Sequence, residues 1–145
     1  MKRVLFLCTE NSCRSQMAEA ITRRFLGKDV QASSAGTRPS KVNPKAIEVL
    51  KEIGIDISGA RSKHIDEFAG ERFDLVVTLC GGARDACPFW PGQGKRLHFG
   101  LDDPAKAKGT RQEVLSSFRA VRDRIIDELI PILKKELDLQ ESSNA

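Results

Sequence analysis

The chain has 145 residues, of which 40% are apolar and 30% charged, and it carries a net charge of +4 with an isoelectric point of about 9.0. Length and composition are those of one soluble globular domain. No apolar run approaches the roughly 20 residues that span a bilayer, and the basic charge comes without the aromatic interleaving or motifs of nucleic-acid binding. We therefore expect no membrane or nucleic-acid partner, whereas the modest basic bias suits an anionic substrate.

The first residues and the cysteine count indicate a cellular compartment. Only five apolar or near-apolar residues follow Met1-Lys2-Arg3, which is too short for the core of a signal peptide, so we expect a cytoplasmic protein. In that compartment, four cysteines are more often catalytic, redox-active or metal-binding than a static disulfide framework.

The first half of the chain predicts strand, helix, strand and helix. Residues 3–7 (RVLFL) form a nearly continuous apolar run, which is typical of a buried parallel strand. A polar segment follows, and apolar residues in helical spacing then run to Gly27. Residues 30–34 are a second candidate strand. A second helix begins at Pro44, a residue favoured at the first helical position, and stops at Gly54.

The second half predicts two more strands and a long helix. Residues 73–79 (FDLVVTL) give the strongest strand signal, and residues 97–99 give a weaker one. The final helix begins near Arg111, follows the 3.6-residue period, and contains Pro131, which can kink it.

Alternation of strands and helices predicts an α/β fold. We expect one domain with a small parallel, four-stranded sheet and helices on both faces. Residues 1–139 form the single catalytic domain in this interpretation, and residues 140–145 (QESSNA) form a frayed tail.

Residues 8–15 (CTENSCRS) fit the pattern C-x5-R followed by Ser, between a predicted strand and a predicted helix. Backbone N–H groups and the positive end of a helix can bind a tetrahedral oxyanion there, and the same field favours the nucleophilic thiolate form of Cys8. Arg14 can hold two anion oxygens through its planar guanidinium. The alternative is a buried core cysteine beside a solvated arginine. The predicted oxyanion-binding and supporting residues are Thr9, Glu10, Asn11, Ser12, Cys13, Arg14 and Ser15, with Cys13 in a structural role and Ser15 bonded to the Cys8 sulfur.

Two further cysteines, Cys80 and Cys87, follow the strongest predicted strand. Cys8 also ends a predicted strand, and ligands of parallel sheets bind at that edge, so we expect Cys8 and Cys80 to share it. The spacings C-x4-C and C-x6-C match zinc sites poorly, and inert buried cysteine is the better alternative. If residues 80–87 are helical, their ends lie roughly 10 Å apart along the axis, whereas a disulfide needs Cα atoms within roughly 7 Å. Oxidation would then require this segment to refold, which Gly81 and Gly82 would ease.

Asp103 precedes Pro104 after the last predicted strand. A carboxyl group on a rigid Asp-Pro turn can protonate a leaving oxygen, and the alternative is a simple turn or helix cap. His64 and His98 have no histidine or cysteine three or four residues away, and we predict no metal and no cofactor.

The segment CTENSCRSQMAE (residues 8–19) resembles the oxyanion loop of the low-molecular-weight tyrosine phosphatase superfamily. Its continuation SQMAE and the segment VVTLCGGARDACP (residues 76–88) resemble the thioredoxin-coupled arsenate reductase branch. In the superfamily the aspartate directly before a proline is the general acid, a role that maps to Asp103. Two positions depart from the pattern: Glu10 replaces a frequent glycine, and Ala105 replaces the aromatic residue of the phosphatases.

The resemblance implies an arsenate reductase with a thiol relay. Cys8 would attack arsenic, Cys80 would then attack Cys8 and release arsenite, and Cys87 would attack Cys80 and move the disulfide outward. Thioredoxin would be the reductant, with phosphate or sulfate as competing oxyanions, and we expect a monomer. The implied catalytic residues are Cys8, Arg14, Asp103, Cys80 and Cys87.

Two other functions remain open at this stage. A phosphatase acting on phosphotyrosine or small phosphate esters would use Cys8, Arg14 and Asp103 equally well, and a metalloid or redox sensor would bind without turnover. A requirement for Cys80 and Cys87 separates the reductase from the phosphatase.

Two positions carry secondary expectations. Some family members bind potassium through Glu, Ser and Asp residues; Glu19 and Ser34 match, but Lys63 stands where the aspartate would be, so we predict that its ammonium group replaces the ion. Trp90 is interpreted as a packing residue, with docking of the reductant as the alternative.

Overall fold

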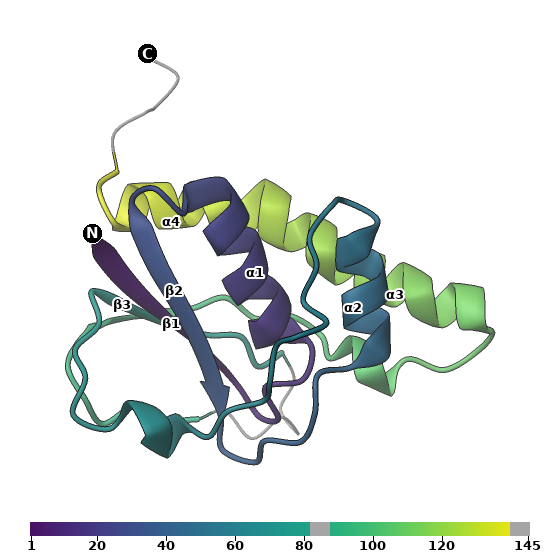
Figure 1. Cartoon of the computed structure of the whole chain (residues 1–145), viewed down its shortest axis with the longest axis horizontal. Coiled ribbons are helices and arrows are strands. Elements are labelled where there is room, and N and C mark those ends of the chain that lie inside the picture. The colour runs from purple at the N-terminus through teal and green to yellow at the C-terminus, as the bar shows by residue number, and fades with distance from the viewer. Residues whose placement is uncertain (82–87, 140–145) are drawn as a thin grey trace.

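Four parallel strands in the order β2-β1-β3-β4 form the sheet of the computed structural model, which describes residues 1–81 and 88–139 (Figure 1). The predicted α/β class and the four-stranded parallel sheet are confirmed. Cys87, the 82–87 portion of the proposed refolding segment and the tail 140–145 lie outside the described residues. The strands are β1 (Lys2–Cys8), β2 (Val30–Gly36), β3 (Leu75–Thr78) and β4 (Lys95–His98).

The central strand β1 is buried on both faces, as its continuous apolar run predicts. Because side chains alternate along a strand, Val4 and Phe6 enter one core, whereas Leu5 and Leu7 enter the other. β1 pairs with β2 on one side and with β3 on the other, so Cys8 lies at the carboxyl edge in the middle of the sheet.

The α-helices contribute to the core on the Phe6 side of the sheet. The opposite side is covered by the one-turn 3-10 helix η1 (Ile65–Phe68) and by two aromatic residues, Phe73 and Trp90. Trp90 is only 4% exposed and meets the Phe73 ring edge-on at 5.6 Å, which agrees with the packing interpretation. The helices of the first side are α1 (Arg14–Leu26), α2 (Pro44–Lys51), α3 (Arg111–Arg124) and α4 (Ile130–Glu136).

The predicted final helix contains a π turn, η3 (Ile125–Leu129), between α3 and α4. The N–H of Ile130 bonds to the carbonyl of Ile125, five residues back instead of four. Pro131 supplies the physical reason, because it has no N–H to donate and its ring conflicts with the carbonyl four residues earlier. The irregularity expected at Pro131 therefore takes the form of a widened turn just before it.

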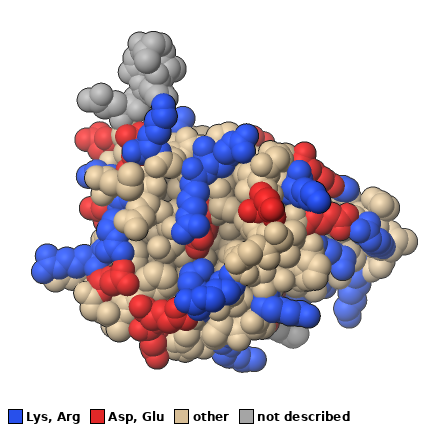
Figure 2. Space-filling model, in the orientation of Figure 1, with Lys and Arg blue, Asp and Glu red and all other residues tan. Residues whose placement is uncertain are grey.

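Charged groups of both signs are interspersed over the face of the molecule that Figure 2 shows, so the net charge of +4 is not gathered into one patch there. Within the described part of the chain, no helix is both long and apolar enough to cross a bilayer.

A charged clamp joins α2 to α3 at Glu52. Its carboxylate lies 2.8 Å from Arg119 Nη2 and 2.7 Å from Arg122 Nη1. Hydrogen bonds from Arg119, and then from Arg122, lower the pKa of Glu52 from 4.5 to about 2.

We expect Glu52→Gln to remove a part of the stability that depends on pH. The lowered pKa of the folded state means that Glu52 stabilises the fold above pH 4.5, and that this contribution is lost as the pH falls from 4.5 to about 2. Because the clamp is partly solvated, the effect should stay below about 1 kcal/mol. Urea unfolding of both proteins at several pH values tests this: the difference should be present at neutral pH and absent near pH 2, and a difference independent of pH would contradict it.

Candidate active site

The loop from residue 8 to residue 15, called the oxyanion loop below, joins β1 to α1 with its backbone carbonyls turned outward. The carbonyls of Thr9, Glu10 and Ser12 accept hydrogen bonds of 2.9, 3.3 and 3.0 Å from N–H groups in residues 38–43. A trans peptide places its C=O and N–H on opposite sides, so the N–H groups that follow these carbonyls turn toward the inside of the loop. Inward N–H groups of this kind are suited to an anion, and binding of an oxyanion by this loop stays a prediction.

Asn11 holds the loop from within. It is fully buried and has a φ of 52°, in the left-handed region that asparagine tolerates better than most residues. Its Oδ1 accepts 2.9 Å bonds from the Lys63 N–H and from Gln16 Nε2. Its Nδ2 donates to Ser15 Oγ at 2.7 Å and to Ser34 Oγ at 2.9 Å. All four hydrogen-bonding positions of the side-chain amide are therefore used.

The bond from Asn11 orients the Ser15 hydroxyl toward Cys8. Ser15 Oγ lies 2.8 Å from Cys8 Sγ, and Cys8 is 2% exposed. Because the Asn11 amide donates to the Ser15 oxygen, the hydroxyl proton of Ser15 is available for the Cys8 sulfur. The two side chains are thus placed for a hydrogen bond from Ser15 to the sulfur, and the role of Cys8 as the nucleophile stays a prediction.

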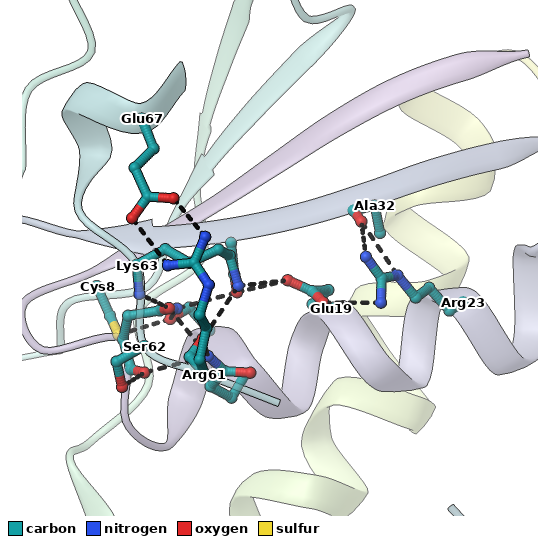
Figure 3. A network of polar contacts seen from close by, with 12 residues as sticks. Cys8, Glu19, Arg23, Ala32, Arg61, Ser62, Lys63 and Glu67 are labelled. Carbon is teal, nitrogen blue, oxygen red and sulfur yellow. Dashed lines mark hydrogen bonds and ion pairs between the residues drawn. The ribbon is translucent and has the colours of Figure 1, made fainter. Parts of the chain in front are cut away.

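The same network continues to Glu19 (Figure 3). Ser34 Oγ donates to Glu19 Oε1 at 2.6 Å, and Lys63 Nζ lies 3.6 Å from that oxygen. Arg23 Nη1 lies 3.0 Å from the other carboxylate oxygen. An ammonium group thus stands beside the residues that matched a potassium site, and replacement of the ion by Lys63 stays a prediction.

Arg14 is buried at the start of α1 and fixed from a distant loop. Its Nη1 donates to the Leu101 carbonyl at 3.1 Å, and its Nη2 lies 3.7 Å from Asp103 Oδ2. Asp103 caps the 3-10 helix η2 (Pro104–Lys106), since its Oδ1 accepts the N–H of Ala105 at 3.0 Å. One carboxylate oxygen of Asp103 therefore caps the turn, and the other faces the guanidinium. The role of Asp103 as the general acid stays a prediction.

These groups surround a cavity of about 320 Å³. Sequence reasoning missed three of its lining residues, Arg38, Asn43 and Lys106, which lie in turns and helix ends without a motif. Glu10 is exposed at the rim, where Ser40 Oγ donates to its carboxylate at 3.0 Å. The described lining residues are Cys8, Thr9, Glu10, Ser12, Cys13, Arg14, Arg38, Asn43, Asp103, Ala105 and Lys106.

Cys13 lines the cavity but is a poor nucleophile. Burial, as the largest cause, raises its pKa to about 12, so it remains a neutral thiol at physiological pH. The structural role that was expected for Cys13 stays a prediction.

Cys80 follows β3, the strand next to β1, at the same carboxyl edge as Cys8. It is 4% exposed and disulfide-bonded, whereas Cys8 and Cys13 are free thiols. Among the described residues that line the cavity, Cys80 does not appear. The structure therefore brings Cys8 and Cys80 to one edge of the sheet with Cys80 in an oxidised state.

Gly81, the residue after Cys80, lies against the loop that holds Arg14. A Cβ atom at this position would lie 2.3 Å from the Leu101 carbonyl oxygen, so only glycine fits. The same oxygen accepts the hydrogen bond from Arg14. The backbone beside Cys80 therefore packs directly against the group that positions Arg14.

His64 and His98 lie away from these residues. His64 Nδ1 accepts the Asp66 N–H at the start of η1, and His98 Nδ1 lies 2.8 Å from Thr78 Oγ1. Over residues 1–81 and 88–139, no group of three or more His, Cys, Asp or Glu side chains is arranged to hold a metal ion.

Comparison with known proteins agrees with this geometry. The arsenate reductase of Halalkalibacterium halodurans is 52% identical over 124 residues, which cover 86% of this chain and 89% of that protein. A solved structure described as an arsenate reductase in the phosphate binding state has a TM-score of 0.72 and 33% identity, covering 93% of this chain and 98% of the other. The thioredoxin-dependent arsenate reductase of Corynebacterium glutamicum has a TM-score of 0.65 and 30% identity, covering 97% of this chain and 64% of that one.

The family model described as low molecular weight phosphotyrosine protein phosphatase matches residues 3–143, nearly the full length of the sequence. Its match spans the oxyanion loop, the redox segment and the Asp-Pro turn. The chain therefore belongs to the low molecular weight phosphotyrosine protein phosphatase family.

Proposed function

We propose that this chain is an arsenate reductase, which converts arsenate to arsenite by a three-cysteine relay and is regenerated by thioredoxin. The observation that carries the proposal is the pairing of a free thiol, Cys8, at the oxyanion cavity with an oxidised Cys80 at the same sheet edge. A phosphatase needs only the first of these sulfurs. The proteins to which the chain is similar, named arsenate reductases, support the same activity.

The first step is bond formation between Cys8 and arsenic. Inward N–H groups and the Arg14 guanidinium hold the arsenate oxygens, and the Cys8 thiolate attacks the arsenic atom. Asp103 donates a proton to the departing oxygen, which leaves as water. The position of Asp103 Oδ2, 3.7 Å from Arg14 Nη2, supports this role because it puts the acid beside the bound anion.

The second and third steps move two electrons and then the disulfide. The Cys80 thiolate attacks the Cys8 sulfur, and the electron pair of the S–As bond stays on arsenic, which leaves as arsenite. A Cys8–Cys80 disulfide remains. The Cys87 thiolate then attacks Cys80, so that Cys8 is released as a thiolate and the disulfide joins Cys80 to Cys87. The two thiols of thioredoxin then reduce that disulfide, become a disulfide themselves, and return this chain to its starting state.

The phosphatase alternative lacks a feature that would hold an aryl ester. None of the described residues that line the cavity is aromatic, and Ala105 occupies the position after the Asp-Pro pair. A small inorganic anion needs no such grip. We infer further that residues 1–139 act as a single, monomeric catalytic domain in the cytoplasm, with phosphate and sulfate as competing anions.

Arsenite formation with thioredoxin, thioredoxin reductase and NADPH tests the proposal. Wild type should turn over repeatedly, whereas Cys87→Ser should stop after about one equivalent of arsenite per enzyme. Without the Cys87 thiolate to attack Cys80, the Cys8–Cys80 disulfide remains and Cys8 cannot react again. Absence of arsenite from the wild type, with phosphate-ester hydrolysis indifferent to Cys87→Ser, would overturn the reductase and leave a phosphatase.

A further inference from the structure

The side chain of Phe89 is 74% exposed, one of three large apolar side chains that the described structure leaves in water. Isolated exposed apolar residues are common and need no explanation by themselves. Phe89 differs by its place in the chain, because it follows Cys87 by two residues.

Chain geometry keeps Phe89 close to the Cys87 sulfur that a reducing partner would reach. Two residues span at most about 7 Å between Cα atoms in any conformation. A partner that exchanges a disulfide must bring its own sulfur within about 2 Å of the attacked sulfur. Protein interfaces extend well beyond 7 Å, with about 20 to 30 residues on each side, so an exposed Phe89 is within reach of such a partner.

The attacked sulfur has to be that of Cys87. Cys80 is only 4% exposed, so a protein-sized reductant has little access to its sulfur. One partner thiolate attacks Cys87 and releases Cys80 as a thiolate. The second partner thiolate then attacks the first, so Cys87 leaves as a thiolate and the partner leaves with its own disulfide.

The backbone that follows Phe89 is held by hydrogen bonds and packing. The Arg96 guanidinium lies over the Phe89 ring at 5.4 Å and donates to the carbonyls of Trp90 and Gly92. Trp90 is buried against Phe73 and donates its indole N–H to a nearby carbonyl. A side chain beside an anchored backbone, with a guanidinium over its ring, loses less conformational entropy on docking than an unsupported side chain, which favours a binding anchor.

We propose that Phe89, supported by Arg96, is the docking anchor for the protein dithiol that reduces this chain, which must carry an apolar surface beside its reactive cysteine. This inference depends on the proposed reductase function, since it names the surface through which that cycle is completed. Aromatic side chains at the centre of an interface often dominate its binding energy.

The test compares Phe89→Ala with Phe25→Ala, a matched loss of an exposed phenyl ring on α1, where Phe25 is 50% exposed. Phe89→Ala should raise KM for thioredoxin by about tenfold or more, whereas Phe25→Ala should leave it at the wild-type value. Phe89→Leu should recover a large part of the loss, because it restores an apolar anchor.

Replacing thioredoxin with dithiothreitol separates docking from chemistry. A small dithiol needs no protein surface, so Phe89→Ala and wild type should form arsenite at the same rate with it. An unchanged KM for thioredoxin in Phe89→Ala, or an equal loss with dithiothreitol, would overturn the anchor while the reductase stands. Failure of the wild type to form arsenite with either reductant would instead overturn the proposed function, and the anchor with it.

Discussion

Arg14→Lys should lower kcat/KM for arsenate by about 100- to 1000-fold, the range seen when one donor to a developing oxyanion is removed. The substitution keeps the positive charge near Asp103 but replaces a planar fork of donors with a point charge. Nη1 of Arg14 donates to the Leu101 carbonyl. A guanidinium has further N–H donors in the same plane that can bind the anion, whereas the ammonium group of a lysine has no such fixed arrangement. Steady-state kinetics with arsenate and competition by phosphate would measure both the turnover and the affinity.

Arg24→Lys is the control for this prediction, because Arg24 is an exposed arginine on the same helix, α1. It should leave the kinetics unchanged, and thermal unfolding should show that both variants are folded. A loss of less than about tenfold in Arg14→Lys would mean that backbone N–H groups bind the anion without the guanidinium fork.

Asn11→Ala should destabilise the protein by about 3 to 5 kcal/mol, because several buried groups lose their partners and each costs about 1 to 3 kcal/mol. The Lys63 N–H and the Gln16 amide lose an acceptor, and Ser15 and Ser34 lose a donor. Alanine also has to adopt a φ of 52°, which adds strain. Urea unfolding would measure the free energy, and arsenate turnover should fall because Ser15 is no longer oriented toward Cys8.

Asn11→Gly separates the two causes in this prediction. Glycine tolerates the positive φ but cannot form the side-chain bonds, so it should be more stable than Asn11→Ala by roughly 1 kcal/mol and still well below wild type. If both variants unfold within about 1 kcal/mol of wild type, the four bonds of Asn11 make no net contribution to stability.

The sequence was most informative where its pattern is local. Residues 3–7 predicted β1 correctly, and the C-x5-R segment predicted the loop between β1 and the start of α1, because continuous burial and a strand-loop-helix junction are visible in the composition. That this loop binds an oxyanion stays a prediction. β4 was predicted at 97–99 but spans Lys95–His98. It is an edge strand with three exposed residues, so it lacks the apolar signature of a central strand.

Features that depend on tertiary contacts could not be predicted. η1 is a single turn with no periodicity, although the pairing of His64 with Glu67 in its capping box is a signal that was available. Arg38 reaches the cavity only because residues 38–43 bond to the outward carbonyls of the oxyanion loop. Lys106 reaches it because Asp103 fixes the turn of η2. No sequence motif or spacing indicates that Arg38 and Lys106 line the cavity.

The outward carbonyls of the oxyanion loop have a consequence for selectivity. Because segments elsewhere in the chain already satisfy them, the inward N–H groups are in place before any anion arrives. A cradle set in advance responds to tetrahedral shape and negative charge, and arsenate and phosphate share both. Discrimination between arsenate and phosphate must then occur in the step in which Cys80 attacks Cys8, because arsenic accepts two electrons there and phosphorus does not. Mutations that merely tighten the cradle should therefore increase occupancy by phosphate, and they would slow detoxification in a phosphate-rich cell.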